Sequence, residues 1–426
     1  MLKTIAKKFQ RFRPESASVR NVLKLAGGTA GSQVIAVAAA PILTRLYGPE
    51  SFGVLATFAS ILGLLNVVSS LRYELAIALP EDDDDAIILV WLCFVLVGIS
   101  TALTALGVAL LGGQLVGWLQ QPQLKPLLWF LPLGVLLNGI YQPLSYWAIR
   151  RRQFGLLARS KFSQSIFGVM TSLAIAPLGN IGLILGQIVS QGSAFIPLLR
   201  RSVAMLGRDE KDMPGALLKK LRQYSHFAAY SSPAGVVNMI GIELPTLVFA
   251  SAFGAANVGE LAIAQRLVLL PVGIVGSSVS QVFLAQASCH WRLGSLGPFV
   301  RKAGLMLLAM GIFLSLSMTL VVAPAALFIL GKQWVNVSHI IPMLSPLLIG
   351  QLTISTLSMA FIVSENNQLE LLSQFAQAIL RLGILIAAVL AGLGFEISVL
   401  AFSAGSFLGY ACYGFILHVS LEVKQK

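Results

Sequence analysis

Charged residues are scarce in this chain. Only 11% of its 426 residues are Asp, Glu, Lys or Arg, whereas 56% are hydrophobic and the mean hydropathy is +0.82. Soluble domains carry about 25% charged residues, so the composition excludes a soluble fold. Cysteine is also rare, and Cys93, Cys289 and Cys412 share no spacing typical of a disulfide framework. We expect all three to be reduced packing residues.

The sequence lacks the motifs of soluble enzymes. It contains no Walker loop, nucleophile elbow or metalloprotease motif, and its four histidines are scattered without metal-ligand spacing. The absence of these motifs predicts that the protein is not an enzyme and has no catalytic residues, cofactor or metal. A cleavable signal peptide is also not expected, because the first apolar run begins near Val22 and is too long for one.

Long apolar runs are abundant. Each approaches the ~20 residues that a helix needs to cross a bilayer, and none alternates polar and apolar residues as barrel strands do. The fold class is therefore all-α integral membrane with twelve transmembrane helices. We expect them near residues 22–43, 52–79, 86–111, 126–148, 160–178, 181–199, 226–253, 260–284, 303–330, 339–363, 369–393 and 396–419.

The basic residues are distributed asymmetrically. With a cytoplasmic N-terminus, 24 of the 30 Lys and Arg residues fall in cytoplasmic segments, three in periplasmic segments and three within helices. This distribution predicts a multi-pass protein of the bacterial cytoplasmic (inner) membrane with both termini cytoplasmic. It also accounts for the net charge of +13 without a nucleic-acid partner.

The turn between the first two helices recurs in the second half of the chain. At an offset of 206 residues, Phe253-Gly254, Val258-Gly259 and Leu261-Ala262 match Tyr47-Gly48, Phe52-Gly53 and Leu55-Ala56. Because each half has an even number of helices, the repeats are parallel, and we expect two pseudo-symmetric six-helix lobes around a central cavity. The predicted parts are a cytoplasmic basic tail (1–21), an N-terminal lobe (22–199), a cytoplasmic linker (200–225), a C-terminal lobe (226–419) and a cytoplasmic tail (420–426).

Helix 369–393 carries the clearest polar stripe. Glu370, Gln374, Gln377 and Arg381 follow at i, i+4, i+7 and i+11, which places them on one face. Polar groups that face lipid are costly, so this face should meet a cavity, or else form a buried network between helices. We predict Arg381, Gln377 and Gln374 as substrate-binding residues and Glu370 as an ion-coupling residue.

Two other helices carry polar faces. Arg266, with Gly273, Ser277 and Gln281, follows one face of helix 260–284; Arg266 either meets the cavity or snorkels to the periplasmic surface. Asn66, Ser70 and Glu74 follow one face of helix 52–79. Arg72 lies ~160° from Glu74 on an ideal helix, so it should contact a neighbouring helix or lipid phosphate.

Glu243, in helix 226–253, is either a proton site or a paired structural carboxylate. Arg266, Asn66 and Arg72 thus join the substrate-binding candidates, and Glu74 and Glu243 join the ion-coupling candidates. Weaker polar faces are formed by Thr29 with Gln33, by Gln187 with Gln191, and by Ser403, Ser406, Tyr410 and Tyr413.

An acidic run, Glu81-Asp82-Asp83-Asp84-Asp85, follows Pro80. Adjacent aspartates hold a metal in some sugar-nucleotide transferases, but no soluble nucleotide-binding domain surrounds this run. A solvated cytoplasmic turn is the favoured interpretation.

Several of these segments resemble bacterial polysaccharide-biosynthesis flippases, the O-antigen or exopolysaccharide repeat-unit translocases of the multidrug/oligosaccharidyl-lipid/polysaccharide exporter superfamily. The resemblance rests on Pro41–Tyr47 (PILTRLY), Phe52-Gly53, Arg72–Ile77 (RYELAI) and Ala264-Gln265-Arg266. It implies that the protein flips an undecaprenyl-pyrophosphate-linked oligosaccharide to the periplasmic leaflet by alternating access, for lipopolysaccharide O-antigen or exopolysaccharide biosynthesis. It also implies membrane lipid, a polysaccharide polymerase and a chain-length regulator as partners.

Two other functions compete with this one. A drug or cation antiporter of the same superfamily would need an acidic, aromatic cavity, but three intrahelical arginines stand against Glu74 and Glu243. A membrane glycan polymerase or ligase would need a catalytic loop outside the membrane, and periplasmic link 112–125 contains no paired acids. An arginine suits the pyrophosphate, so the charge balance favours an anionic substrate.

Overall fold

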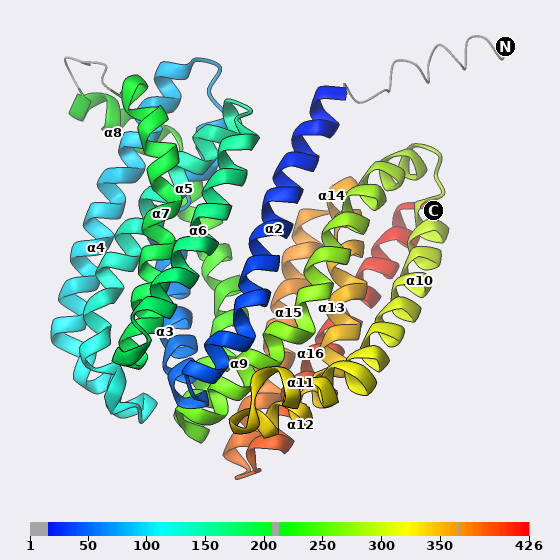
Figure 1. Cartoon of the computed structure of the whole chain (residues 1–426). Helices are drawn as coiled ribbons and strands as arrows, with labels where there is room; N and C mark the ends of the chain where they lie inside the picture. Colours follow the sequence, from blue (N-terminus) through cyan, green and yellow to red (C-terminus); the bar gives the residue numbers. More distant parts are fainter. Residues whose placement is uncertain (1–15, 207–212, 365, 426) are drawn as a thin grey trace. The chain divides into compact units, whose positions relative to one another are not determined.

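The computed structural model describes residues 16–206, 213–364 and 366–425, and the regular elements in these ranges are helices (Figure 1). Eight helices in them are long and apolar enough to cross a membrane. The number is nine if Lys332–Met343 and Ser345–Phe361, which meet at a 54° bend, form one span. The prediction of an all-α integral membrane protein is confirmed.

The predicted number of twelve helices is compatible with these elements. Helix α9 (Ser232–Arg292) combines two predicted spans, and Gly254 breaks it with φ 80° and ψ 175°, a conformation that only glycine adopts readily. Helices α2 (Ser16–Leu46) and α6 (Phe154–Ala174) occupy two further predicted spans. Neither is among the nine, so the exact count stays a prediction.

The chain forms two compact units. The first unit contains residues 1–40, 68–106 and 129–232. After α2 come η1 (Tyr73–Ala78), α4 (Asp83–Leu119, up to residue 106), α5 (Phe130–Arg150), α6, η4 (Ala176–Leu178), α7 (Asn180–Leu206), α8 (Met213–Gln223) and η5 (Phe227–Ser231). Helices α5, α6 and α7 pack side by side (Figure 1) around a core of Tyr141, Leu144, Ala148, Leu157, Ala194 and Leu198.

The predicted helix 52–79 is wrong beyond Val68, where α3 (Pro49–Val68) ends. Leu71 and Arg72 adopt left-handed conformations with φ 50° and 64° before η1 begins. Within this turn, Ser70 Oγ donates a hydrogen bond to the Glu74 carboxylate oxygen Oε2. The predicted Asn66–Ser70–Glu74 helical face therefore does not exist, and the ~160° separation of Arg72 from Glu74 does not apply.

A tertiary contact stabilises this turn. The buried Tyr73 hydroxyl donates a hydrogen bond to the Leu221 carbonyl oxygen in α8, at 2.8 Å. Burial raises the pKa of Tyr73, so the phenol stays protonated as a donor. The apolar composition of residues 69–79 favours a continued helix, but this distant contact favours the turn.

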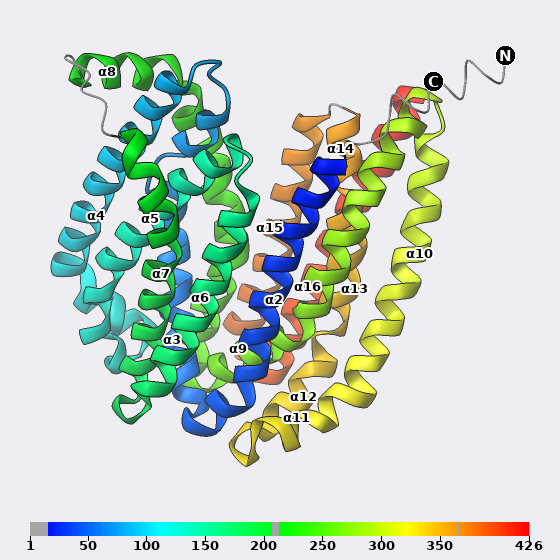
Figure 2. The same cartoon turned by 45° about the horizontal axis from the view of Figure 1, so that its top comes forward.

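The acidic run is partly solvated, as expected, but two of its aspartates also form ion pairs. Asp83 forms ion pairs with Arg150, at 3.1 Å, and with Arg151. Asp85 lies 2.6 Å from the ammonium of Lys220, a buried side chain of α8. Figure 2 shows α8 across the end of helices α4 and α5. The ion pair of Asp85 with Lys220 thus holds α8, an amphipathic helix within the predicted linker 200–225, against the rest of the first unit.

The second unit contains residues 41–67, 107–128 and 233–426. Besides the end of α2, α3, the end of α4 and α9, its elements are η2 (Pro122–Leu124), η3 (Pro126–Trp129), α10 (Leu296–Ser317), η6 (Met318–Val322), α11 (Ala323–Leu330), η7 (Lys332–Trp334), α12 (Val335–Met343), α13 (Ser345–Leu357), α14 (Met359–Val363), α15 (Asn367–Leu390) and α16 (Phe395–Gln425). A buried cluster that includes Phe283, Leu307, Ile354, Phe361 and Tyr413 joins α9, α10, α13, α14 and α16.

Two glycines of the predicted repeat make equivalent contacts in this unit. A Cβ atom on Gly53 would lie 1.7 Å from the Ala255 carbonyl oxygen, and one on Gly259 would lie 1.8 Å from the Pro49 carbonyl oxygen. Gly53 and Gly259 are related by the offset of 206, and so are Pro49 and Ala255. Such reciprocity is the geometry of a two-fold axis, which supports the internal repeat. The predicted lobe boundaries at 199 and 226 stay a prediction.

Candidate functional site

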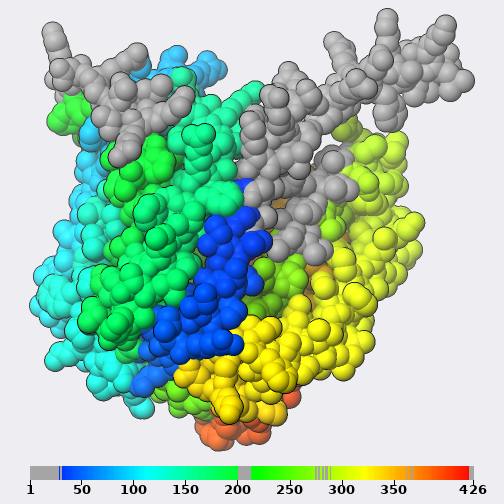
Figure 3. All heavy atoms as spheres, viewed as in Figure 1, coloured from blue at the N-terminus to red at the C-terminus, as the bar shows by residue number. Residues whose placement is uncertain are grey.

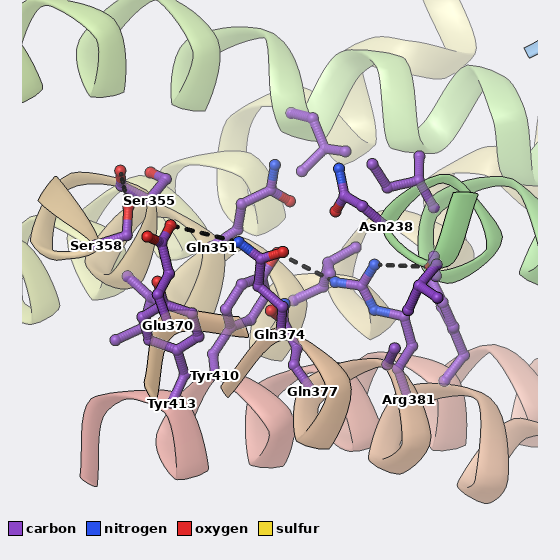
Figure 4. Close-up of a pocket in the computed structure, with 18 of the residues that line it drawn as sticks. Asn238, Gln351, Ser355, Ser358, Glu370, Gln374, Gln377, Arg381, Tyr410 and Tyr413 are labelled. Atoms are coloured by element: carbon purple, nitrogen blue, oxygen red, sulfur yellow. Dashed lines mark hydrogen bonds between the residues drawn. The ribbon is translucent and has the colours of Figure 1, made fainter. Parts of the chain in front are cut away.

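A polar cavity of about 380 Å³ lies within the second unit, between α9, α13, α15 and α16 (Figure 4). Its apolar wall includes Leu269, Leu347, Ile354 and Phe402. Its polar lining consists of amide, hydroxyl and phenol side chains with one guanidinium and one carboxylate. These residues are Asn238, Gln265, Gln351, Ser355, Ser358, Glu370, Gln374, Gln377, Arg381, Tyr410 and Tyr413.

Arg381 is half-buried and held by neutral groups. Its Nη1 donates to the Gly241 carbonyl oxygen at 3.2 Å, and its Nη2 donates to the Tyr410 hydroxyl at 3.1 Å. Its guanidinium carbon lies 5.6 Å from the centroid of the Tyr410 ring and 5.9 Å from that of Phe402. No carboxylate in the described part of the chain forms an ion pair with it, and Nε is buried without a hydrogen bond there. The positive charge of the guanidinium is therefore not compensated by a carboxylate among the described residues, and it could attract an anion.

The other three members of the predicted stripe on α15 also line the cavity. Gln374 Nε2 donates to Glu370 Oε1 at 3.4 Å, and Figure 4 shows the two glutamines between Glu370 and Arg381. Eleven residues of helical rise put Glu370 about 16 Å from Arg381 along the axis. Gly409 allows α16 to approach closely, because a Cβ there would lie 3.0 Å from Gln377. The cavity thus has a cationic end, an amide middle and an acidic end.

Three helices contribute polar groups that the sequence analysis did not single out as a site. Asn238 and Gln265 come from α9, whereas Gln351 and Ser355 come from α13 and Ser358 directly follows its last residue. The last three follow at i, i+4 and i+7, so their stripe was visible in the sequence. Tyr410 and Tyr413, from a polar face considered weak, complete the lining. The Tyr413 and Ser358 hydroxyls are hydrogen-bonded to each other.

Three predicted residues of the second unit lie outside this lining. Arg266 is exposed, although its neighbour Gln265 lines the cavity. The side chains of Ser277 and Gln281, predicted on its face, lie outside the described residues. Asn66 is half-buried in the last turns of α3. Glu243 accepts a hydrogen bond from the Ser60 hydroxyl of α3, and both alternatives for it, a proton site or a paired structural carboxylate, stay predictions.

The two remaining candidates lie in the first unit. Glu74 is buried and accepts the hydrogen bond from Ser70, whereas Arg72 is partly exposed. Both charges lie close enough to Tyr146 of α5 to interact with its phenol. The left-handed turn therefore brings Arg72 and Glu74 near the same side chain, which an ideal helix would not do. Within the described ranges, no three His, Cys, Asp or Glu residues form a group that could hold a metal.

Comparison with known proteins identifies the family. The profile of the polysaccharide biosynthesis protein family matches residues 42–339, which is more than half of the chain. The chain belongs to this family. The resemblance predicted from its motifs is therefore confirmed. No curated protein matches the chain in sequence.

Solved structures share its fold. The lipid II flippase MurJ in an inward closed conformation has a TM-score of 0.70 at 16% identity, over 94% of this chain and 90% of that one. An inward-facing multidrug resistance MATE family transporter of the MOP superfamily has a TM-score of 0.67 at 12% identity, over 92% and 95%. The Vibrio cholerae MATE transporter VcmN in its bent form reaches 0.56 at 14%, over 96% and 99%. These neighbours are transporters and a flippase, in agreement with the prediction that this chain is not an enzyme.

Proposed function

We propose that this protein is a flippase that moves an undecaprenyl-pyrophosphate-linked oligosaccharide from the cytoplasmic to the periplasmic leaflet. The family concerns polysaccharide biosynthesis, and one neighbour in fold is a lipid II flippase. The observation that carries the proposal is the composition of the cavity in the second unit. It combines an arginine without an acidic partner among the described residues with a row of amide, hydroxyl and aromatic groups.

Each part of the substrate has a counterpart in this lining. The pyrophosphate is anionic, and a guanidinium binds phosphate oxygens through two parallel hydrogen bonds. Arg381 is the group proposed for this contact. Sugar hydroxyls both donate and accept hydrogen bonds, as do the Gln374 and Gln377 amides. Aromatic rings such as Tyr410 offer an apolar face to a sugar ring, while the polyprenyl tail stays in the lipid.

A coupling ion would act at the acidic end of the same cavity. Glu370 is the carboxylate of the lining, and protonation or cation binding there would change its charge and its bond to Gln374. Glu74 and Glu243 remain further candidates, as Arg72, Arg266 and Asn66 do for the substrate. We propose alternating access between the two predicted lobes, 22–199 and 226–419, with both termini in the cytoplasm.

The drug or cation antiporter is the second candidate. Glu370 and the aromatic groups Phe402, Tyr410 and Tyr413 could receive an organic cation. Arg381 opposes this reading, because a permanent positive charge in the same cavity repels such a substrate. The flippase proposal itself does not depend on whether the glycan is an O-antigen, capsule or exopolysaccharide unit, because each would be linked to the same anionic carrier lipid.

Reconstituted protein tests the proposal. Proteoliposomes containing a labelled undecaprenyl-pyrophosphate oligosaccharide in one leaflet would be assayed for its appearance in the other, through access to a membrane-impermeant glycosidase. We expect protein-dependent translocation. Arg381→Ala should lower its rate by roughly 100-fold, whereas Arg301→Ala, at an exposed charge outside the cavity, should leave it unchanged. Transport of an organic cation such as ethidium, with none of the lipid-linked sugar, would establish the antiporter instead.

A further inference from the structure

A second cavity of the same unit lies between the last turns of α9 and the first half of α10. Its volume is about 750 Å³, within the range of ligand sites. On α10, Lys302, Met306 and Met310 follow at i, i+4 and i+8; on α9, Phe283, Gln286 and His290 follow at i, i+3 and i+7. Each set shares one helix face, so the two helices form a continuous groove between them.

Three polar residues gather at one end of the groove, and the rest of its described lining is apolar except for Gln286. Lys302, His290 and Ser295 lie at the end nearest the α9–α10 turn, where His290 Nδ1 and Ser295 Oγ are 2.8 Å apart. The His290 ring stacks on Phe299, with centroids 4.4 Å apart. Phe299 in turn stacks on Phe283 at 5.3 Å. An amphiphile whose head is anionic and whose chain is apolar fits this order of groups.

The outer helix faces a hydrocarbon environment. In α10, Leu305 and Met306 are 64% and 65% exposed, and Phe313 is 68% exposed. Figure 3 shows α10, in yellow and yellow-green, at the surface of the second unit. The α9–α10 turn and the C-terminus lie at the same end of this unit (Figure 1). The distribution of basic residues predicts that this end is cytoplasmic.

We propose that this groove binds an anionic phospholipid of the cytoplasmic leaflet, with its phosphate at Lys302 and one acyl chain along Phe283, Met306 and Met310. The groove runs along α10 from Pro298 to Met310, a helical rise of about 18 Å. This length is close to one leaflet, or half of a ~30 Å hydrocarbon core. Methionine side chains adapt readily to a flexible chain.

The charge of the groove distinguishes this lipid from the proposed transport substrate. Among its described lining residues, Lys302 carries the one permanent charge, which matches a phosphodiester with a single negative charge. The described lining of the groove contains no guanidinium, the group that binds two phosphate oxygens at once and suits a pyrophosphate. An undecaprenyl chain is also far longer than a groove that spans one leaflet. The groove is thus distinct in chemistry from the cavity with Arg381, although Ile354 and Tyr413 of that cavity belong to the same core as Phe283 and Leu307.

Native mass spectrometry of the purified full-length protein tests this site. Added phosphatidylglycerol should be retained in preference to phosphatidylcholine. Lys302→Gln should weaken its retention about fivefold, the factor expected for one basic residue at an anionic lipid surface. Arg301→Gln is the matched control, because Arg301 is adjacent and exposed but does not line the groove, and it should retain the lipid as the unaltered protein does. Lys302→Arg should restore binding.

Filling the groove gives a second measurement. Phosphatidylglycerol should raise the melting temperature of the protein, since a ligand of the folded state stabilises it. Met306→Trp should remove this increase, and Leu305→Trp, equally exposed but outside the lining, should keep it. Equal retention by Lys302→Gln and Arg301→Gln, or equal binding of phosphatidylcholine, would overturn the proposal. Preferential retention of undecaprenyl phosphate would also overturn it, because the occupant would then be the carrier lipid.

Discussion

Replacing Arg381 perturbs the cationic end of the cavity without removing a buried ion pair. Its protein partners are the Gly241 carbonyl oxygen, the Tyr410 hydroxyl and two aromatic rings. Arg381→Ala would leave the first two without this donor, at a cost of about 1 kcal/mol each. We expect a modest loss of stability and normal insertion into the membrane.

The effect on substrate should be larger. A charge-assisted hydrogen bond contributes about 1.5–3 kcal/mol. Losing two such bonds to the pyrophosphate should therefore cost about 3 kcal/mol or more of binding free energy. Arg381→Ala should therefore lower translocation by roughly 100-fold. Arg381→Lys retains the charge and loses the second prong, and its translocation should fall by about tenfold.

The assay is the translocation rate of the lipid-linked oligosaccharide in proteoliposomes, normalised to the amount of inserted protein. A deletion strain complemented with each variant would report the same order through surface polysaccharide. If Arg381→Ala translocates at the rate of the unaltered protein, the guanidinium is structural and does not grip the pyrophosphate. If Lys is no better than Ala, the geometry of the guanidinium matters more than its charge.

Two further experiments test the fold. Gly53→Ala and Gly259→Ala each insert a methyl group within 2 Å of a backbone oxygen, so both should shift the same helix crossing and reduce translocation similarly. A crosslinking assay between the two helices would measure the shift. A loss of translocation confined to one variant would contradict the repeat. Asp85→Asn should release the buried ammonium of Lys220 from its partner and destabilise the docking of α8 by about 1–2 kcal/mol, a value reduced because Asp85 is 46% exposed. Hydrogen exchange of α8 would report this loss, whereas Asp82→Asn, at an exposed neighbour, should leave the exchange unchanged.

The sequence alone determined the class of this protein, because a bilayer imposes a composition and a length on every helix that crosses it. It also determined the stripe of Glu370, Gln374, Gln377 and Arg381, since residues at these spacings share a helix face whatever surrounds them. The structure places all four in one cavity. The repeat was visible in the sequence for a similar local reason, because Gly48 and Gly53 recur as Gly254 and Gly259.

Only the tertiary structure decided where helices end and which polar groups meet. The helix that begins at Pro49 ends at Val68, and the turn after it contains Tyr73, which donates to the carbonyl of Leu221, nearly 150 residues away in sequence. Asp83 and Asp85 are paired because distant basic side chains reach them.

Helix packing also explains why Arg266 and Arg381 lie in different places. Arg266 and Arg381 both follow polar helical faces, yet Arg381 lines the cavity and Arg266 does not. Helical periodicity fixes the direction of a side chain relative to its own helix. The packing of that helix against its neighbours decides whether the direction leads into this cavity.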